Sequence, residues 1–95
     1  ALDWGLVNRV YPAETLLDES LTLAKRLARG PVNALARIRQ LHDSAATLDF
    51  ESQLREEDRL QSACSAGPEA QEGRAAFRDK RAPDFSAIPL ATQTP

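Results

Sequence analysis

Two Gly–Pro pairs, Gly30–Pro31 and Gly67–Pro68, constrain the fold of this chain more than any other feature. Glycine commonly follows the last turn of a helix and proline commonly occupies the first, so each pair predicts one helix ending where the next begins. Together with Pro12, the pairs divide the chain into segments of helical length. We therefore expect several helices with short connections, in which neighbouring helices lie antiparallel or at steep angles.

Apolar residues between these breaks recur at helical spacing and predict four short-to-medium helices. The first is expected over residues 13–29, the second over about 31–44, and the fourth over 68–80. Asp49 is expected to cap the third helix, which continues to the second Gly–Pro pair. These segments leave little room for strands, so the fold class predicted from the pattern is mainly α.

The N-terminal residues differ from the rest. The stretch ALDWG is typical of the last turn of a helix closed by Gly5 in a left-handed conformation. Residues 6–11, LVNRVY, alternate between two faces and predict one short, half-buried strand that ends at Pro12. A lone strand has no hydrogen-bond partner, and no other convincing strand follows. We therefore expect this opening to be a piece of a longer chain whose sheet lies elsewhere.

The composition excludes several classes of protein. Of the 95 residues, 42% are apolar and 27% charged, as in ordinary soluble proteins, and 12 basic against 14 acidic residues give a net charge of −2. No segment reaches the roughly 18 consecutive apolar residues that a membrane span needs, and no secretory signal opens the chain. The single cysteine, Cys64, lies on an apolar stripe and is interpreted as a core residue. It favours a reducing, cytoplasmic setting.

No active site can be assembled from the residues alone. The acidic run 56–58 points to different faces of a helix and is typical of a solvated surface. His42 has no catalytic partner nearby in sequence, and Ser62 and Ser65 stand in no nucleophile motif. The glycines form no phosphate-binding loop. No metal site is predicted either.

Two features remain, both in the stretch EGRAAFRDKRAPDF, residues 72–85. Gly73 lies inside the fourth helix, where it is either tolerated or allows close approach of another helix or subunit. Around Phe77, four cations against Asp79 give a local charge of +3; these cations are Arg74, Arg78, Lys80 and Arg81. This cluster fits a solvated helix end, which the helix dipole favours, or a site for an anionic ligand that carries a ring.

Three stretches in this order resemble the C-terminal third of the crotonase family, the enoyl-CoA hydratases and isomerases. They are ALDWGLVNRVYP, the leucine-rich helix that ends in LARGP, and EGRAAFRDKRAPDF. The resemblance covers residues 1 to about 86, and the most specific parts are GLVNRVYP and the pattern EG…AF…KR.P.F. One departure is Gly67–Pro68, where the family often has Ser or Thr and an acidic residue before the last helix.

The resemblance implies that the catalytic core and this helical segment have different functions. The family's core, a spiral of βα turns, carries the oxyanion hole and the catalytic acidic residues, and this core is expected before residue 1. Residues 1–12 then correspond to the end of the core, 13–86 to a helical region that builds the trimer and covers the acyl-CoA, and 87–95 to an irregular tail. The segment is expected to contain no catalytic residue and to be inactive by itself.

The resemblance also implies a ligand. Phe77 and Lys80 match positions that contact the adenine and phosphate region of coenzyme A, and with Arg81 they are the expected CoA-binding residues. No cofactor is expected to be covalently bound, because coenzyme A enters as part of the acyl-CoA substrate. The expected partners are further copies of the chain, as a trimer or hexamer, with no nucleic acid and no membrane. The alternative is a free-standing helical module that binds a partner protein.

Overall fold

The computed structural model describes residues 1–91 and forms four helices. They are α1 (Ala13–Ala28), α2 (Val32–Ala45), α3 (Phe50–Ala66) and α4 (Pro68–Asp79). The helices lie within two residues of their predicted bounds, which confirms the mainly α fold class. None of the helices in the described part of the chain has the length and apolar character that crossing a bilayer requires.

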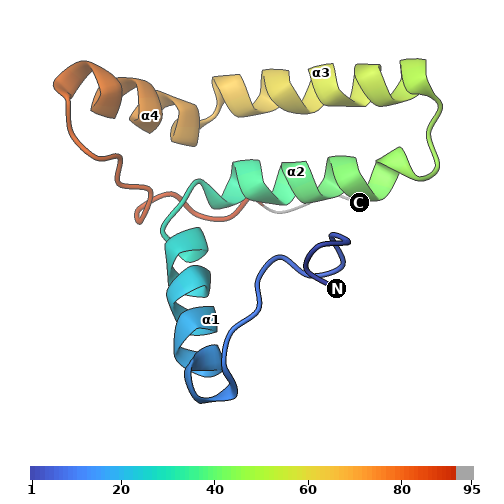
Figure 1. The fold of residues 1–95 in the computed structure, drawn as a ribbon. Coiled ribbons are helices and arrows are strands. Elements are labelled where there is room, and N and C mark those ends of the chain that lie inside the picture. Colours follow the sequence, from blue (N-terminus) through green and yellow to red (C-terminus); the bar gives the residue numbers. More distant parts are fainter. Residues whose placement is uncertain (92–95) are drawn as a thin grey trace.

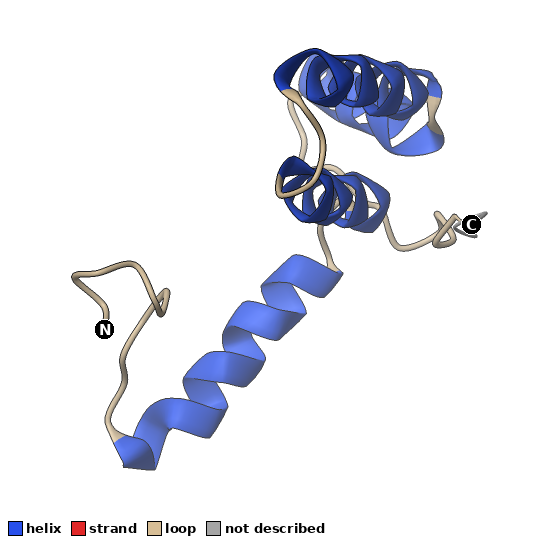
Figure 2. Ribbon diagram, turned by 90° about the vertical axis from the view of Figure 1, so that its right-hand side faces the viewer, coloured by secondary structure: helices blue, strands red, loops and turns tan. Residues whose placement is uncertain are grey.

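Helices α2 and α3 form an antiparallel hairpin, and α4 follows α3 in nearly the same direction (Figure 1). After α4 the chain turns back and runs along α2 (Figure 1). Helix α1 projects away from the other three (Figure 2). The arrangement is therefore open, with extents of 43 × 40 × 25 Å.

The predicted helix boundaries have the expected causes. Asp49 Oδ1 accepts a hydrogen bond of 2.7 Å from the Ser52 N–H, so Asp49 is the N-cap of α3. Gly67 breaks the chain between α3 and α4 in an extended conformation, and Pro68 occupies the first turn of α4. No side chain caps α4, in keeping with the departure from the family pattern at this turn.

The start of α2 is capped by a residue far away in sequence. Pro31 stands at the N-cap position and has no side-chain acceptor to offer. Glu69 of α4 supplies it: Oε1 accepts from the Asn33 N–H at 2.7 Å, and Oε2 accepts from the Ala34 N–H at 3.0 Å. A carboxylate here satisfies N–H groups that have no partner within the helix, and the helix dipole favours its charge. Glu69 thereby connects α4 to α2.

Asn33 extends this connection to the C-terminal segment. Its Nδ2 donates to Glu69 Oε1 at 3.0 Å and to the Pro89 carbonyl at 3.1 Å. Its Oδ1 accepts from the Ala91 N–H at 2.6 Å. Residues 87–91 form neither helix nor strand, while 92–95, the end of the predicted irregular tail, lie outside the described residues.

The N-terminal segment confirms one prediction and corrects another. Gly5 has a φ of 72°, its N–H donates to the Leu2 carbonyl at 3.0 Å, and the Leu6 N–H donates to the Ala1 carbonyl at 3.0 Å. This is the Schellman pattern of a helical turn closed by a left-handed glycine. The strand predicted over residues 6–11 is absent: residues 1–91 contain no strand. A strand requires hydrogen bonds to a neighbouring strand, and residues 6–11 form no such ladder within the described chain.

Burial is sparse. Among the described residues, only Leu60 and Ala76 are buried, with 2% and 1% exposed. The apolar stripe of α1 predicted a helix correctly, yet α1 has no buried residue and Leu17 is 70% exposed. Cys64, expected in the core, is only half-buried. The helices therefore present apolar faces that have no partner within the described part of the chain.

Replacing Glu69 with alanine should lower the free energy of unfolding by about 1–2 kcal/mol, because α2 loses its cap and the N–H groups lose their acceptor. Urea unfolding followed by circular dichroism measures this change. Glu57→Ala is the matched control, since Glu57 is an exposed carboxylate on α3. Equal losses in the two variants would contradict the capping role of Glu69.

Candidate functional site at the end of helix α4

Helix α4 ends in a left-handed turn at Lys80. The Arg81 N–H donates to the Ala76 carbonyl at 3.0 Å and the Lys80 N–H donates to the Phe77 carbonyl at 3.3 Å, again the Schellman pattern. Lys80 has φ 52° and ψ 41°, and no other non-glycine residue of the described chain has a positive φ. Glycine is the usual residue at this position, because a side chain there costs roughly 1–2 kcal/mol. Strain of this kind is concentrated at functional sites.

A second carboxylate, Glu72, fixes the chain just after this turn. Arg81 Nη1 donates to Glu72 Oε1 at 2.6 Å and Nη2 donates to Oε2 at 3.1 Å, a bidentate ion pair. The Asp84 N–H also donates to Oε1, at 2.8 Å. The hydrogen bonds from Arg81 and Asp84 lower the pKa of Glu72 from 4.5 to about 2. We refer to Glu72, Arg81 and Asp84 together as the Glu72 clamp.

The structure separates the three predicted site residues into two groups. Phe77 is 88% exposed and Lys80 is exposed, with no ion pair among residues 1–91. Arg81, by contrast, is held by Glu72, although 44% of its side chain is still exposed. The end of α4 thus presents an exposed aromatic ring and, three residues later, an ammonium group without an ion pair among residues 1–91, followed by the paired guanidinium of Arg81. The hydrogen bond between Glu72 and Asp84 was not predicted, because the two residues lie twelve apart and beyond the end of the helix.

Gly73 has open space around it in the described chain. A Cβ built on this residue would meet no atom within 4 Å, leaving out the backbone of α4 itself. Close approach of another helix of this chain is therefore not the reason for glycine at this position. Two explanations for glycine at position 73 remain: the helix tolerates it, or another subunit approaches closely there.

The other polar candidates form no catalytic arrangement in residues 1–91. Glu56 is paired with Arg59, whose Nη2 lies 2.6 Å from Oε1, and with Gln40 at 3.2 Å. His42 is exposed on α2. No three His, Cys, Asp or Glu side chains of the described residues converge as a metal ion would require.

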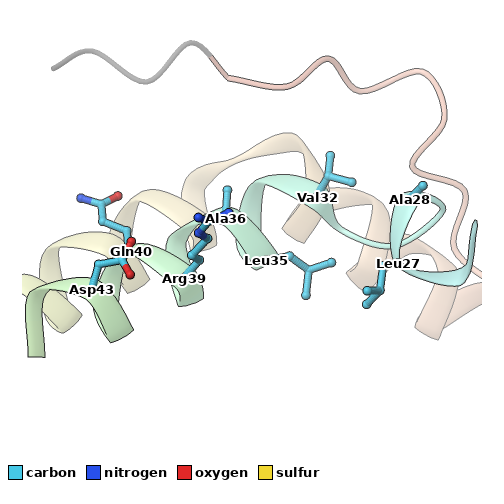
Figure 3. A pocket seen from close by; sticks show the side chains of 8 residues that line it. All are labelled: Leu27, Ala28, Val32, Leu35, Ala36, Arg39, Gln40 and Asp43. Atoms are coloured by element: carbon cyan, nitrogen blue, oxygen red, sulfur yellow. The ribbon is translucent and has the colours of Figure 1, made fainter. Parts of the chain in front are cut away.

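A groove between α1 and α2 was not predicted. It measures ≈ 740 Å³ and is lined by the side chains labelled in Figure 3: Leu27, Ala28, Val32, Leu35, Ala36, Arg39, Gln40 and Asp43. Leu27 and Leu35 reach the same side of the groove from the two helices (Figure 3). The predicted apolar stripes include several of the residues that line this groove. The groove itself depends on the angle between α1 and α2, which the sequence pattern does not give. The groove is largely apolar and includes none of the residues at the end of α4.

Comparison with known proteins identifies the fold. A sequence model of the enoyl-CoA hydratase/isomerase family matches residues 1–87. The chain belongs to this family. It is 36% identical over 86 residues to the 1,2-epoxyphenylacetyl-CoA isomerase of Escherichia coli K12, covering 90% of this chain and 33% of the relative. The 2,3-dehydroadipyl-CoA hydratase of the same organism is 33% identical over 81 residues, covering 85% of this chain and 32% of that protein.

Solved structures agree with this assignment. An enoyl-CoA hydratase from Geobacillus kaustophilus superposes with a TM-score of 0.84 at 31% identity, over 93% of this chain and 33% of that one. An enoyl-CoA hydratase from Polaromonas sp. JS666 gives 0.82 at 36% identity, over 87% and 32%. The chain thus spans about a third of the length of the relatives it matches. The crotonase resemblance and the helical fold predicted with it are confirmed.

The pKa of Glu72 predicts how its ion pair responds to acid. The folded value of about 2 lies below the ordinary 4.5, so ionised Glu72 stabilises the fold fully above pH 4.5 and this contribution disappears as the pH falls toward 2. The difference in unfolding free energy between the wild type and Glu72→Gln should shrink over this range. Urea unfolding at several pH values measures it.

The difference between the two proteins is the informative quantity, because Asp49, Glu56 and Asp84 also have lowered pKa values and titrate in acid. Asp49 and Glu56 lie away from Glu72 and contribute equally to both proteins, whereas the charge of Glu72 raises the pKa of Asp84, so the difference reports Glu72 together with its neighbour Asp84. A difference that stays constant from neutral pH down to pH 2 would show that the Glu72 ion pair does not stabilise the fold.

Proposed function

We propose that this chain is the C-terminal segment of an enoyl-CoA hydratase/isomerase, in which it contacts coenzyme A and neighbouring subunits. The enzyme would add water to a 2-enoyl-CoA or shift its double bond. Residues 1–12 would end the catalytic core, residues 13–86 would form the helical region and 87–95 the tail. The observation that carries the proposal is the exposed pair Phe77 and Lys80 at the end of α4, in a chain of this family.

The chemistry of the pair suits coenzyme A. Its adenine offers a flat ring that can stack on the 88% exposed ring of Phe77. Its phosphate groups are strong acceptors for the free Lys80 ammonium group, which is not engaged by a carboxylate among residues 1–91. Arg81 would add positive charge nearby while its guanidinium stays paired with Glu72. The predicted roles of Phe77, Lys80 and Arg81 thus continue here as a proposal.

The contribution to the reaction would be binding and not chemistry. Hydration or isomerisation of a thioester requires preorganised hydrogen-bond donors at the carbonyl oxygen, and an acid–base group. The carboxylates that could be considered in α4, Glu69 and Glu72, accept hydrogen bonds that hold the fold together. We propose that the catalytic groups belong to the core and that this segment alone does not turn over enoyl-CoA. The cytoplasmic setting stays a prediction from the single cysteine.

Subunit contacts are the second part of the proposal. The leucines of α1 and the groove beside α2 leave apolar surface uncovered in the described chain, and surfaces of this kind are typical of interfaces. A core and further copies of the chain would cover them. The resemblance points to a trimer or hexamer.

Phe77→Ala in the full-length enzyme should weaken acyl-CoA binding about tenfold, as expected for loss of roughly 1–1.5 kcal/mol of aromatic stacking. Lys80→Ala should weaken it most at low ionic strength, because salt screens the attraction between ammonium and phosphate. Isothermal titration at two salt concentrations measures both effects. Arg55→Ala, on the exposed surface of α3, is the control cation. Unchanged affinity in both α4 variants would refute the proposed coenzyme contact.

The isolated 95-residue chain should self-associate at micromolar concentrations, since its uncovered apolar faces bury each other when copies meet. Sedimentation equilibrium gives the mass, and a dye that fluoresces on apolar surfaces reports what stays uncovered. Leu17→Glu, which places a charge on the exposed stripe of α1, should reduce association. A monomer without dye binding would contradict the proposal.

A further inference from the structure

We infer that the Glu72 clamp is a positioning device, which holds Lys80 in its left-handed conformation and so fixes the direction in which its side chain leaves the backbone toward bound coenzyme A. The inference rests on the proposed function, and it assigns Glu72 and Arg81 a role in coenzyme A affinity without contact to the ligand. Phe77 and Lys80 would bind the coenzyme directly.

The left-handed conformation of Lys80 is held by contacts of the residues on either side of it. An L-residue such as Lys80 disfavours φ 52°, and relaxation to a negative φ would redirect its Cα–Cβ bond. Two backbone hydrogen bonds at the end of α4 hold the turn from the helix side. The clamp holds it from the other side, because Glu72 binds the side chain of the next residue, Arg81, and the N–H of Asp84. Both flanks of Lys80 are thereby fixed.

The clamp also leaves the ligand side open. Glu72 precedes Phe77 by five residues, which places the two side chains about 140° apart around an α-helix. Their exposure agrees with this separation, since the Glu72 side chain is 20% exposed while Phe77 is 88% exposed. The ion pair therefore fixes the turn without covering the ring or neutralising the ammonium group. Arg81 is held by a fork of two hydrogen bonds, a geometry that lysine cannot reproduce.

Positioning matters for a residue such as Lys80 because its flexible stem loses conformational freedom when the ammonium group meets a phosphate. A backbone that already points the stem toward the ligand reduces the number of conformations to be lost. Opening the clamp should therefore weaken binding although every ligand-contacting atom is retained. We expect about a fivefold loss of affinity, in the range of coupling between neighbouring residues.

The test is a double-mutant cycle in the full-length enzyme with free coenzyme A as the probe, measured by isothermal titration. The variants are Glu72→Gln, Lys80→Ala and the two combined, with Glu57→Gln on α3 as the control carboxylate. Glu72→Gln should weaken binding about fivefold when Lys80 is present and should have no effect when residue 80 is alanine. The Cα and Cβ chemical shifts of Lys80 should leave left-handed values in Glu72→Gln.

The outcomes separate this inference from the proposed function. If Lys80→Ala does not weaken binding, the proposed contact between Lys80 and coenzyme A is wrong, and the positioning role falls with it. If Lys80→Ala weakens binding and Glu72→Gln does not, the contact stands and the positioning role is overturned. Equal losses from Glu72→Gln in both backgrounds would also overturn it, since they would show a general structural role. Should Glu72→Gln fail to fold, Arg81→Lys opens the clamp from its other partner while keeping the positive charge at residue 81, and completes the same cycle.

Discussion

The carboxylate of Glu69 accepts hydrogen bonds from the backbone of Asn33 and Ala34, and the arrangement of the helices depends on this contact. Pro31, at the start of α2, cannot cap the helix with a side chain. The acceptor comes from α4 instead, so the first turn of α2 is completed only when α3 and α4 have folded back beside it. Asn33 then connects the same point to the C-terminal segment through Pro89 and Ala91. Because so little apolar surface is buried in the described chain, such polar contacts make a larger share of the contacts between its segments than in a well-packed domain.

The two glutamates of helix α4 hold different parts of the chain. Glu69, at its beginning, holds α2, and Glu72, one turn later, holds the segment that follows the helix. The pattern EG…AF…KR.P.F therefore contains two sets of residues, one that holds the fold and one that is exposed. Glu72 and Arg81 form the ion pair, whereas Phe77 and Lys80 face solvent at the left-handed end of the helix. An exposed ring and an ammonium group that is unpaired among residues 1–91 fit, in this arrangement, the proposed contact with coenzyme A.

The sequence predicted the helices well because their signals are local. Asp49 and Pro68 act within the first turn of the helix that they start, and each Gly–Pro pair marks a boundary by itself. The exposure of Phe77 was also predictable, since the ring stands among charged residues near a helix end. The strand expected over 6–11 does not form within residues 1–91 for a physical reason: alternation produces a strand only where a partner exists to pair with it.

The roles of Glu69 and Glu72 could not be predicted, because their partners lie at distances that carry no periodic signal. Asn33 and Glu69 are 36 residues apart, and Glu72 and Arg81 are nine apart across the end of a helix, outside the usual spacing of helical ion pairs. The apolar stripe of α1 shows a second limit of prediction from sequence. Spacing identified the helix, whereas it did not reveal that its leucines stay unburied among the described residues.

Hydrogen–deuterium exchange of the full-length enzyme, with and without coenzyme A, tests the central claim most directly, because it locates the contact without any mutation. The account predicts slower amide exchange over residues 77–81 when coenzyme A is bound, with little change over the exposed surface of α3. Unchanged exchange over residues 77–81, while coenzyme A is bound and protects other parts of the enzyme, would contradict it.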